Sequence, residues 1–132
     1  MYYVQQITIP AQTAEGELDP VIMELSAGTI QRVRVCFPPG CCGLVHLRIY
    51  RYEHQLYPTS PDASFAWDGY VVEFVDSFPL TEVPYEVKLI AWNDDDSYQH
   101  SIQVHIEVAE FDIARILHDL LRKGLGGIFG KH

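Results

Sequence analysis

The chain has 132 residues, of which 48% are hydrophobic, and this length and composition suit one globular domain and exclude a wholly disordered protein. The formal net charge is −9, and because an acidic surface repels phosphate groups, nucleic acid is excluded as a partner of the domain as a whole. We expect no signal peptide, since the first residues carry no basic segment, and no membrane span, since no stretch reaches the ~20 apolar residues that one needs. We therefore expect a protein that is made and used in the cytoplasm, or one that is carried outside by something other than a Sec signal.

Alternation of apolar and polar residues predicts about eight short β-strands. In chain order they cover residues 3–9, 21–25, 29–37, 44–52, 55–57, 70–75, 85–92 and 100–108. Turn and loop residues separate them about every ten residues, which is typical of an all-β antiparallel β-sandwich (jelly-roll or Ig-like). We expect the strands of residues 29–37 and 44–52 to form a hairpin across Pro38-Pro39-Gly40, and Pro79 and Pro84 to bracket a turn.

The inward-facing residues of the predicted strands form the expected core. Each of the four longest alternating segments places an apolar residue at every second position, so that one face of each strand is apolar. We expect the following side chains to be buried between two sheets: Val33, Val35, Val45, Leu47, Val87, Leu89, Ile102, Val104 and Ile106.

The hydrophobic period changes from that of a strand to that of a helix after Ala109, and Gly124 is a natural helix end. The sequence therefore predicts a β-sandwich over residues 1–109, a C-terminal amphipathic helix over 110–124 and a flexible glycine-rich tail over 125–132. Either the helix covers an open edge of its own domain, or it docks on another copy or a larger protein shell. We favour docking, through an assembly interface made of Phe111, Ile113, Ile116, Leu117, Leu120, Leu121, Leu125, Ile128 and Phe129.

An acidic cluster in the loop after residue 92 suggests an alternative function. Carboxylate and amide oxygens are ligands for Ca²⁺, and Trp92-Asn93-Asp94 resembles the calcium-binding triplet of C-type lectins, although the disulfides and partner tripeptide of that family are absent. The ordinary interpretation is a solvent-exposed turn over residues 93–96 without tightly bound metal. The alternative is a glycan-binding module, calcium-assisted if the loop binds the ion, formed by Trp67, Asp68, Trp92, Asn93, Asp94, Asp95 and Asp96.

No motif of a catalytic site is present. The chain has no nucleophile elbow, Walker loop or dinucleotide fingerprint, so we expect no enzyme, no catalytic residue and no cofactor. His46, His105 and a cysteine could form a metal site only if their strands were neighbours. We expect no metal. Cys36, Cys41 and Cys42 are an odd number, so we expect free thiols, with a bridge across the adjacent proline turn as the alternative.

Several segments resemble small uncharacterised β-sandwich proteins of phage-like structural gene sets. They are Phe37-Pro38-Pro39-Gly40-Cys41, Leu44-Val45-His46, His54-Gln55-Leu56-Tyr57-Pro58, Asp68-Gly69-Tyr70 and residues 89–96, and the resemblance covers about two thirds of the chain. It implies a virion accessory protein, such as a capsid decoration, head–tail or tail component, located in the virion or the cytoplasm. It carries over no functional residues. Our hypothesis is therefore a non-enzymatic structural protein that assembles through repeated copies of itself or on a larger protein shell.

Overall fold

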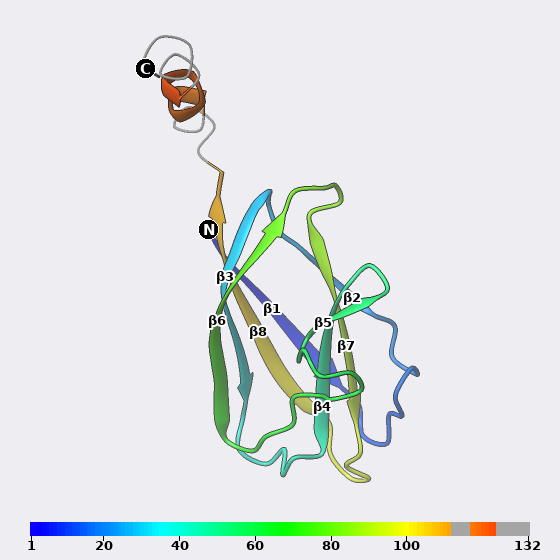
Figure 1. The fold of residues 1–132 in the computed structure, drawn as a ribbon. Coiled ribbons are helices and arrows are strands. Elements are labelled where there is room, and N and C mark those ends of the chain that lie inside the picture. Colours follow the sequence, from blue (N-terminus) through cyan, green and yellow to red (C-terminus); the bar gives the residue numbers. More distant parts are fainter. Residues whose placement is uncertain (112–116, 124–132) are drawn as a thin grey trace.

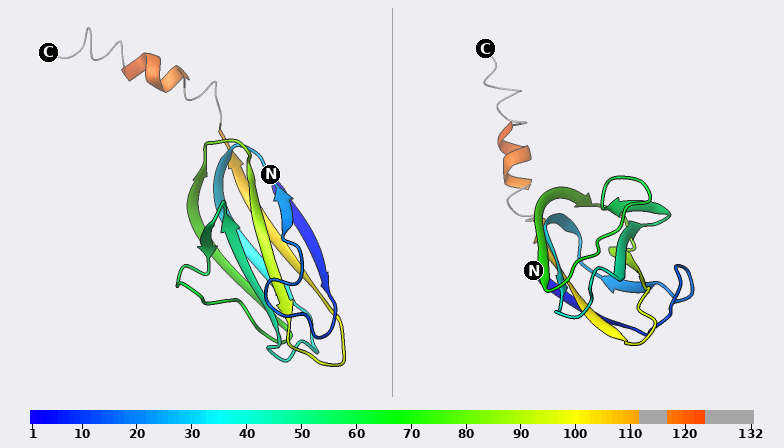
Figure 2. Two further views of the ribbon diagram at one scale, coloured as in Figure 1. Left: turned by 90° about the vertical axis from the view of Figure 1, so that its right-hand side faces the viewer. Right: turned by 90° about the horizontal axis from the view of Figure 1, so that it is seen from below.

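The structure, a computed structural model, describes residues 1–111 and 117–123. Eight antiparallel strands form two four-stranded sheets that face each other, as Figures 1 and 2 show. The strands are β1 (Tyr2–Ile9), β2 (Val21–Glu24), β3 (Gly28–Phe37), β4 (Val45–Arg51), β5 (His54–Tyr57), β6 (Tyr70–Leu80), β7 (Glu86–Asn93) and β8 (His100–Glu110). The predicted antiparallel β-sandwich of about eight strands is therefore confirmed.

The strand order identifies the sandwich as a jelly roll. One sheet has the order β1-β8-β3-β6, which we call sheet A, and the other has the order β2-β7-β4-β5, which we call sheet B. The first strand pairs with the last, the second with the seventh, the third with the sixth and the fourth with the fifth. The chain is thus one long hairpin rolled into two layers, which decides between the two sandwich types that the sequence left open.

Apolar side chains fill the space between the two sheets. All nine side chains expected in the core are at most 1% exposed, so this prediction is confirmed. Tyr57 is also buried and joins the edge strands β5 and β6, because its hydroxyl donates to Asp76 Oδ2 at 2.5 Å. Burial, together with this hydrogen bond, raises the pKa of Tyr57, so the hydroxyl stays protonated and keeps the two sheets joined at this edge.

Two connections differ from the prediction. Residues 29–37 and 44–52 do not form a hairpin, because β3 and β4 belong to different sheets and the loop with Pro38-Pro39-Gly40 crosses between them. The strand predicted over residues 70–75 continues to Leu80 and includes Pro79. β6 lies at the edge of sheet A, where a residue without a backbone N–H is tolerated because that position need not donate to a further strand.

The two ends of the sandwich differ in what they carry. The N-terminus and the C-terminal segment lie at one end, together with the short connections after β2, β4 and β6, whereas the loops after β3 and β7 lie at the opposite end (Figure 1). The chain leaves the sandwich at Glu110, which pairs with Gly28 of β3. A side chain at Gly28 would come within 2.4 Å of the Ala109 carbonyl oxygen, so glycine is required for this close approach of β3 and β8.

Residues 117–123 are helical and belong to the predicted C-terminal helix. Residue 110 belongs to β8, while residues 112–116 and 124–132, including the predicted tail over 125–132, lie outside the described part of the chain. Among the described residues, no helix is long and apolar enough to cross a membrane.

Candidate functional site

The described part of the C-terminal helix exposes its apolar side chains. Leu117, Leu120 and Leu121 are 53%, 60% and 67% exposed, and Phe111, directly after β8, is 37% exposed. Within one chain, these three leucines of the predicted assembly interface are therefore more than half uncovered, whereas Phe111 is partly covered. The other members lie outside the described residues: Ile113, Ile116, Leu125, Ile128 and Phe129.

The expectation of a solvent-exposed turn over residues 93–96 is wrong for Asn93, the last residue of β7, and for Asp95, because both are buried; Asp94 and Asp96 are exposed. The Asn93 amide donates to one carbonyl oxygen at the end of β1, at 3.2 Å, and to another in its own loop, at 3.0 Å. Its Oδ1 accepts the backbone N–H of Asp95 at 2.9 Å. Because a buried polar side chain needs such partners, Asn93 supports the loop from inside the sandwich.

The Asp95 carboxylate completes this support. It accepts the backbone N–H groups of Ser97 and Tyr98, and its other oxygen lies 2.8 Å from His100 Nε2. The hydrogen bond from His100, followed by those from the backbone, holds the pKa of Asp95 below its usual range. The oxygens of Asn93 and Asp95 are thus used inside the protein, and across residues 1–111 and 117–123 no group of three or more His, Cys, Asp or Glu could hold a metal ion.

The remaining residues of the predicted glycan site contact different neighbours. Trp67 is 50% exposed, and its ring centre lies 5.1 Å from that of Tyr70. Asp68 accepts two backbone N–H groups from the loop after β3, at 2.8 and 3.1 Å, and these hydrogen bonds lower its pKa. Trp92 is only 7% exposed. Of the two tryptophans, only Trp67 therefore offers much of its ring to a ligand.

Trp92 belongs to a stack on the outer face of sheet B. The His46 ring lies parallel to it at 4.8 Å, and the Arg48 guanidinium lies 4.9 Å from the indole. His46 also joins two loops, because its Nδ1 is 2.9 Å from Ser64 Oγ and its Nε2 is 2.9 Å from Asp94 Oδ2. The loop before β6 and the loop after β7 are thereby both attached to β4.

Ser64, His46 and Asp94 have the residue types of a hydrolase triad. In such triads the serine contacts Nε2 and the aspartate contacts Nδ1, whereas here the two nitrogens are exchanged. Neither of the two grooves described below is lined by any of the three residues. We therefore interpret the hydrogen bonds of His46 as structural support for the two loops.

The structure separates His46 and His105, which a shared metal site would need close together. His46 is on β4 of sheet B and His105 is on β8 of sheet A, and both point outward, so the two rings lie on opposite faces of the sandwich. His105 Nδ1 is 3.1 Å from the Tyr2 hydroxyl, and Nε2 is 3.1 Å from Gln103 Oε1. Burial and the nearby Arg34 lower the pKa of His105, which favours the neutral ring.

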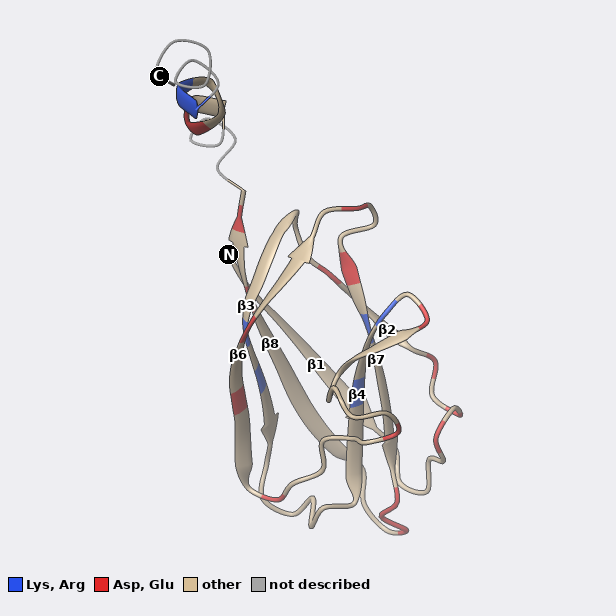
Figure 3. Ribbon diagram, viewed as in Figure 1, with Lys and Arg blue, Asp and Glu red and all other residues tan. Residues whose placement is uncertain are grey.

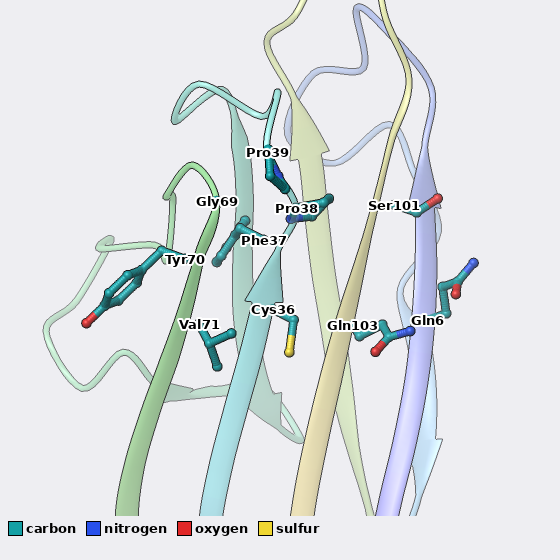
Figure 4. Close-up of a pocket in the computed structure, with 10 residues that line it drawn as sticks. All are labelled: Gln6, Cys36, Phe37, Pro38, Pro39, Gly69, Tyr70, Val71, Ser101 and Gln103. Carbon is teal, nitrogen blue, oxygen red and sulfur yellow. The ribbon is translucent and has the colours of Figure 1, made fainter.

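A shallow groove of about 440 Å³ crosses the outer face of sheet A. Figure 4 shows Val71, Cys36, Gln103 and Gln6 in a row across its four strands. Among the residues that the structure describes, no Asp, Glu, Lys or Arg lines the groove, although the chain is strongly acidic. Its uncharged amides and adjacent aromatic residues form a surface without a fixed charge.

Cys36, Cys41 and Cys42 are all free thiols.

A second groove, of about 510 Å³ and more apolar, lies at the end of the sandwich from which the C-terminal segment leaves. Neither groove could be predicted from the sequence. Each forms where strands that are distant in the sequence meet, so no local pattern marks its lining; the nearest signal was the group of aromatic residues around Trp67.

Comparison with protein-family models, with curated proteins and with solved structures finds no match to this chain. The fold does not indicate the function either, because a jelly roll by itself hosts many unrelated functions.

Proposed function

We propose that this chain is a non-enzymatic structural protein that assembles through its C-terminal helix, as an accessory component, such as a decoration or tail protein, of a virion or similar particle. The observation that carries the proposal is the exposure of Leu117, Leu120 and Leu121 on a helix attached to a sandwich with a complete core. Neighbouring apolar side chains that are exposed together mark a surface for contact with another molecule. The particle itself is suggested by the sequence resemblance.

The positions of the helix and the loops at opposite ends of the sandwich support this proposal. The helix is attached at the end with the N-terminus and the short connections, and the loops after β3 and β7 lie at the other end (Figure 2). A protein anchored through the helix would therefore present those loops outward. Such an arrangement suits an accessory protein on a larger shell.

The magnitudes favour assembly through several contacts. Complete burial of three leucines contributes roughly 5–9 kcal/mol, while the loss of rigid-body freedom on association costs roughly 4–15 kcal/mol. One helix by itself is therefore a weak anchor. Repeated copies, each contributing a helix, raise the overall affinity through effective concentration.

The native mass of the protein tests the proposal. We expect the full chain to form a defined oligomer, and a Leu117→Ser, Leu120→Ser, Leu121→Ser variant to be a monomer with an unchanged β-sheet circular dichroism spectrum. A His118→Ser, Asp119→Ser variant changes the same helix on its polar side and serves as the control. A leucine variant with the native mass of the full chain would contradict the proposal, as would a chain truncated after Glu110 that retains that mass.

A glycan-binding module remains the second candidate, now favoured by Trp67 and Tyr70 beside the uncharged groove on sheet A. Aromatic rings next to neutral hydrogen-bonding groups suit a neutral sugar. We expect a neutral oligosaccharide from a cello-, chito- and malto-series panel to change the tryptophan fluorescence, and Trp67→Ala to abolish the change. Because the oxygens of Asn93 and Asp95 are already used, EDTA should leave any binding unaltered. A panel without any response would remove this candidate.

A further inference from the structure

The apolar groove at the C-terminal end lies between the edge strands of the two sheets. Tyr52 and Leu56 line it from the side of β5, while Phe78 and Pro79 line it from β6. The hydrogen bond from the Tyr57 hydroxyl to Asp76 of β6 joins the same two edge strands. A short amphipathic helix that places leucines into such a groove is a common mode of protein recognition.

The rim of this groove is acidic. Glu53 is almost fully exposed and makes only a surface ion pair, 3.1 Å from Lys88 Nζ. Glu82 also lines the groove, and its carboxylate has no hydrogen-bond or ion-pair partner among the residues that the structure describes. The positive charge of Arg51 is directed into the protein, where it donates to the carbonyl oxygens of residues 82, 84 and 86. The Glu82 carboxylate is therefore available to a partner, while the exposed Glu53 carboxylate shares its charge with Lys88.

The C-terminal segment has the opposite charge. Residues 1–111 contain five Lys or Arg and sixteen Asp or Glu, so this part of the chain is strongly negative. Residues 112–132 contain four Lys or Arg and two Asp or Glu, so the C-terminal segment is positive. Figure 3 shows the acidic residues distributed over the sandwich, while Lys and Arg appear on β3, β4, β7 and the C-terminal helix. Arg122 and Lys123 follow the leucine stripe directly. An acidic rim around an apolar groove is thus complementary to a helix with leucines and a basic end.

We propose that this groove binds the C-terminal helix of a second copy of the chain, with Leu117, Leu120 and Leu121 in the groove and Arg122 and Lys123 near the acidic rim. This inference rests on the proposed function and names the surface that receives the helix. A second copy is favoured over the same chain because, in the single chain, the three leucines are more than half exposed.

The position of the groove favours a closed pair of molecules. Gly28 pairs with Glu110 on one side and with Leu80 on the other, and neighbouring strands are about 4.8 Å apart. The exit of the C-terminal segment is therefore on the order of 10 Å from the strand that lines the groove. Two copies that meet at this end exchange helices reciprocally, which gives two identical contacts and closes the assembly.

Charge exchange tests the inference. The test uses two variants. The groove variant carries Glu53→Lys with Glu82→Lys, and the helix variant carries Arg122→Glu with Lys123→Glu. Sedimentation equilibrium would measure the dissociation constant of each. Each variant alone should assemble roughly tenfold more weakly or worse, because like charges then face each other. The variant with all four changes should recover the assembly. Glu17→Lys with Asp19→Lys changes the net charge as the groove variant does, but outside the groove, and should leave the assembly unchanged.

Mixing distinguishes a second copy from the same chain. An equimolar mixture of the groove variant and the helix variant should form a heterodimer, since each helix then meets a groove of opposite charge. If the four-change variant recovers but the mixture does not, the helix docks on its own chain and the inference is wrong. If neither variant weakens an assembly that the leucine variant abolishes, the groove is not the receiving surface, although the proposed function stands. If the leucine variant also assembles normally, the proposed function itself fails.

Discussion

At the scale of single residues, Asp95 is the side chain that gives the acidic loop a dependence on pH. Its pKa in the folded protein is below the ordinary value of 3.8, chiefly because of the hydrogen bond from His100. A lowered pKa means that the ionised carboxylate stabilises the fold above pH 3.8 and that this contribution is lost as the pH falls through the lower folded-state value. We expect Asp95→Asn to lower the melting temperature by a few degrees at neutral pH and to reduce its fall on acidification. Melting curves from about pH 5 to about pH 2 measure this. Exposed Asp96→Asn is the control, and equal curves for the two variants would contradict the role of Asp95.

Gly28 lies where β3 and β8 approach each other closely, at the exit of the C-terminal segment. A Cβ at this position would meet the Ala109 carbonyl oxygen at 2.4 Å and a Val108 methyl group at 2.8 Å. Because backbone atoms of a central strand cannot move away cheaply, Gly28→Ala should reduce the free energy of unfolding by about 1–3 kcal/mol. Urea denaturation measures the loss. The matched change Thr29→Ala, on the outward side of the same strand, should cost less than about 1 kcal/mol, and a larger loss there than at Gly28 would refute the argument.

At the scale of secondary-structure elements, β7 shows how alternation divides a strand between the core and the solvent. Leu89 is 1% exposed between the sheets, whereas its neighbour Lys88 points outward and makes a surface ion pair with Glu53. Leu89→Ala should therefore reduce the free energy of unfolding by about 2–5 kcal/mol, since it leaves a cavity in the core. Lys88→Ala should cost less than about 1 kcal/mol. Denaturant titration of both variants gives the comparison, and similar losses would mean that the assigned faces of β7 are wrong.

The C-terminal helix is an element of a different kind. The described turns cover residues 117–123, and a helix shorter than about 12–15 residues is only marginally stable in water by itself. Burial of its leucines on another surface therefore stabilises both the contact and the helix. Formation of the helix and assembly are expected to be coupled for this reason.

At the scale of the whole molecule, the division of charge between the sandwich and the C-terminal segment has a measurable consequence. If the basic end of the helix lies near the acidic rim formed by Glu53 and Glu82, salt should screen the attraction between copies. We expect the dissociation constant of the assembly to rise several-fold between about 0.05 M and about 0.5 M NaCl. Sedimentation at several salt concentrations measures this. The groove variant Glu53→Lys with Glu82→Lys should show a smaller or reversed dependence, and a salt response identical to that of the unchanged protein would contradict the charge contact.

Most of the secondary structure could be predicted from the sequence because strand periodicity is a local property. Val33 and Val35 alternate with Arg32 and Arg34, and this pattern alone predicts which side of β3 is buried. The same reasoning holds for β4, β7 and β8. The leucines of the C-terminal helix were likewise recognisable from their spacing.

Tertiary structure alone decided which strands are neighbours and which side chains meet. His46 and His105 follow the same alternating pattern, yet they lie on opposite faces, because a residue's position in a strand does not reveal the sheet to which the strand belongs. Asn93 looked like a loop residue, but long-range hydrogen bonds place it inside the sandwich. The apolar groove likewise exists only because Leu56 and Phe78 come together from the edges of two sheets. The hydrophobic period and the charge of a segment depend on residues that are close in the sequence, so both can be determined from the sequence. A groove depends on packing between segments that are remote along the chain.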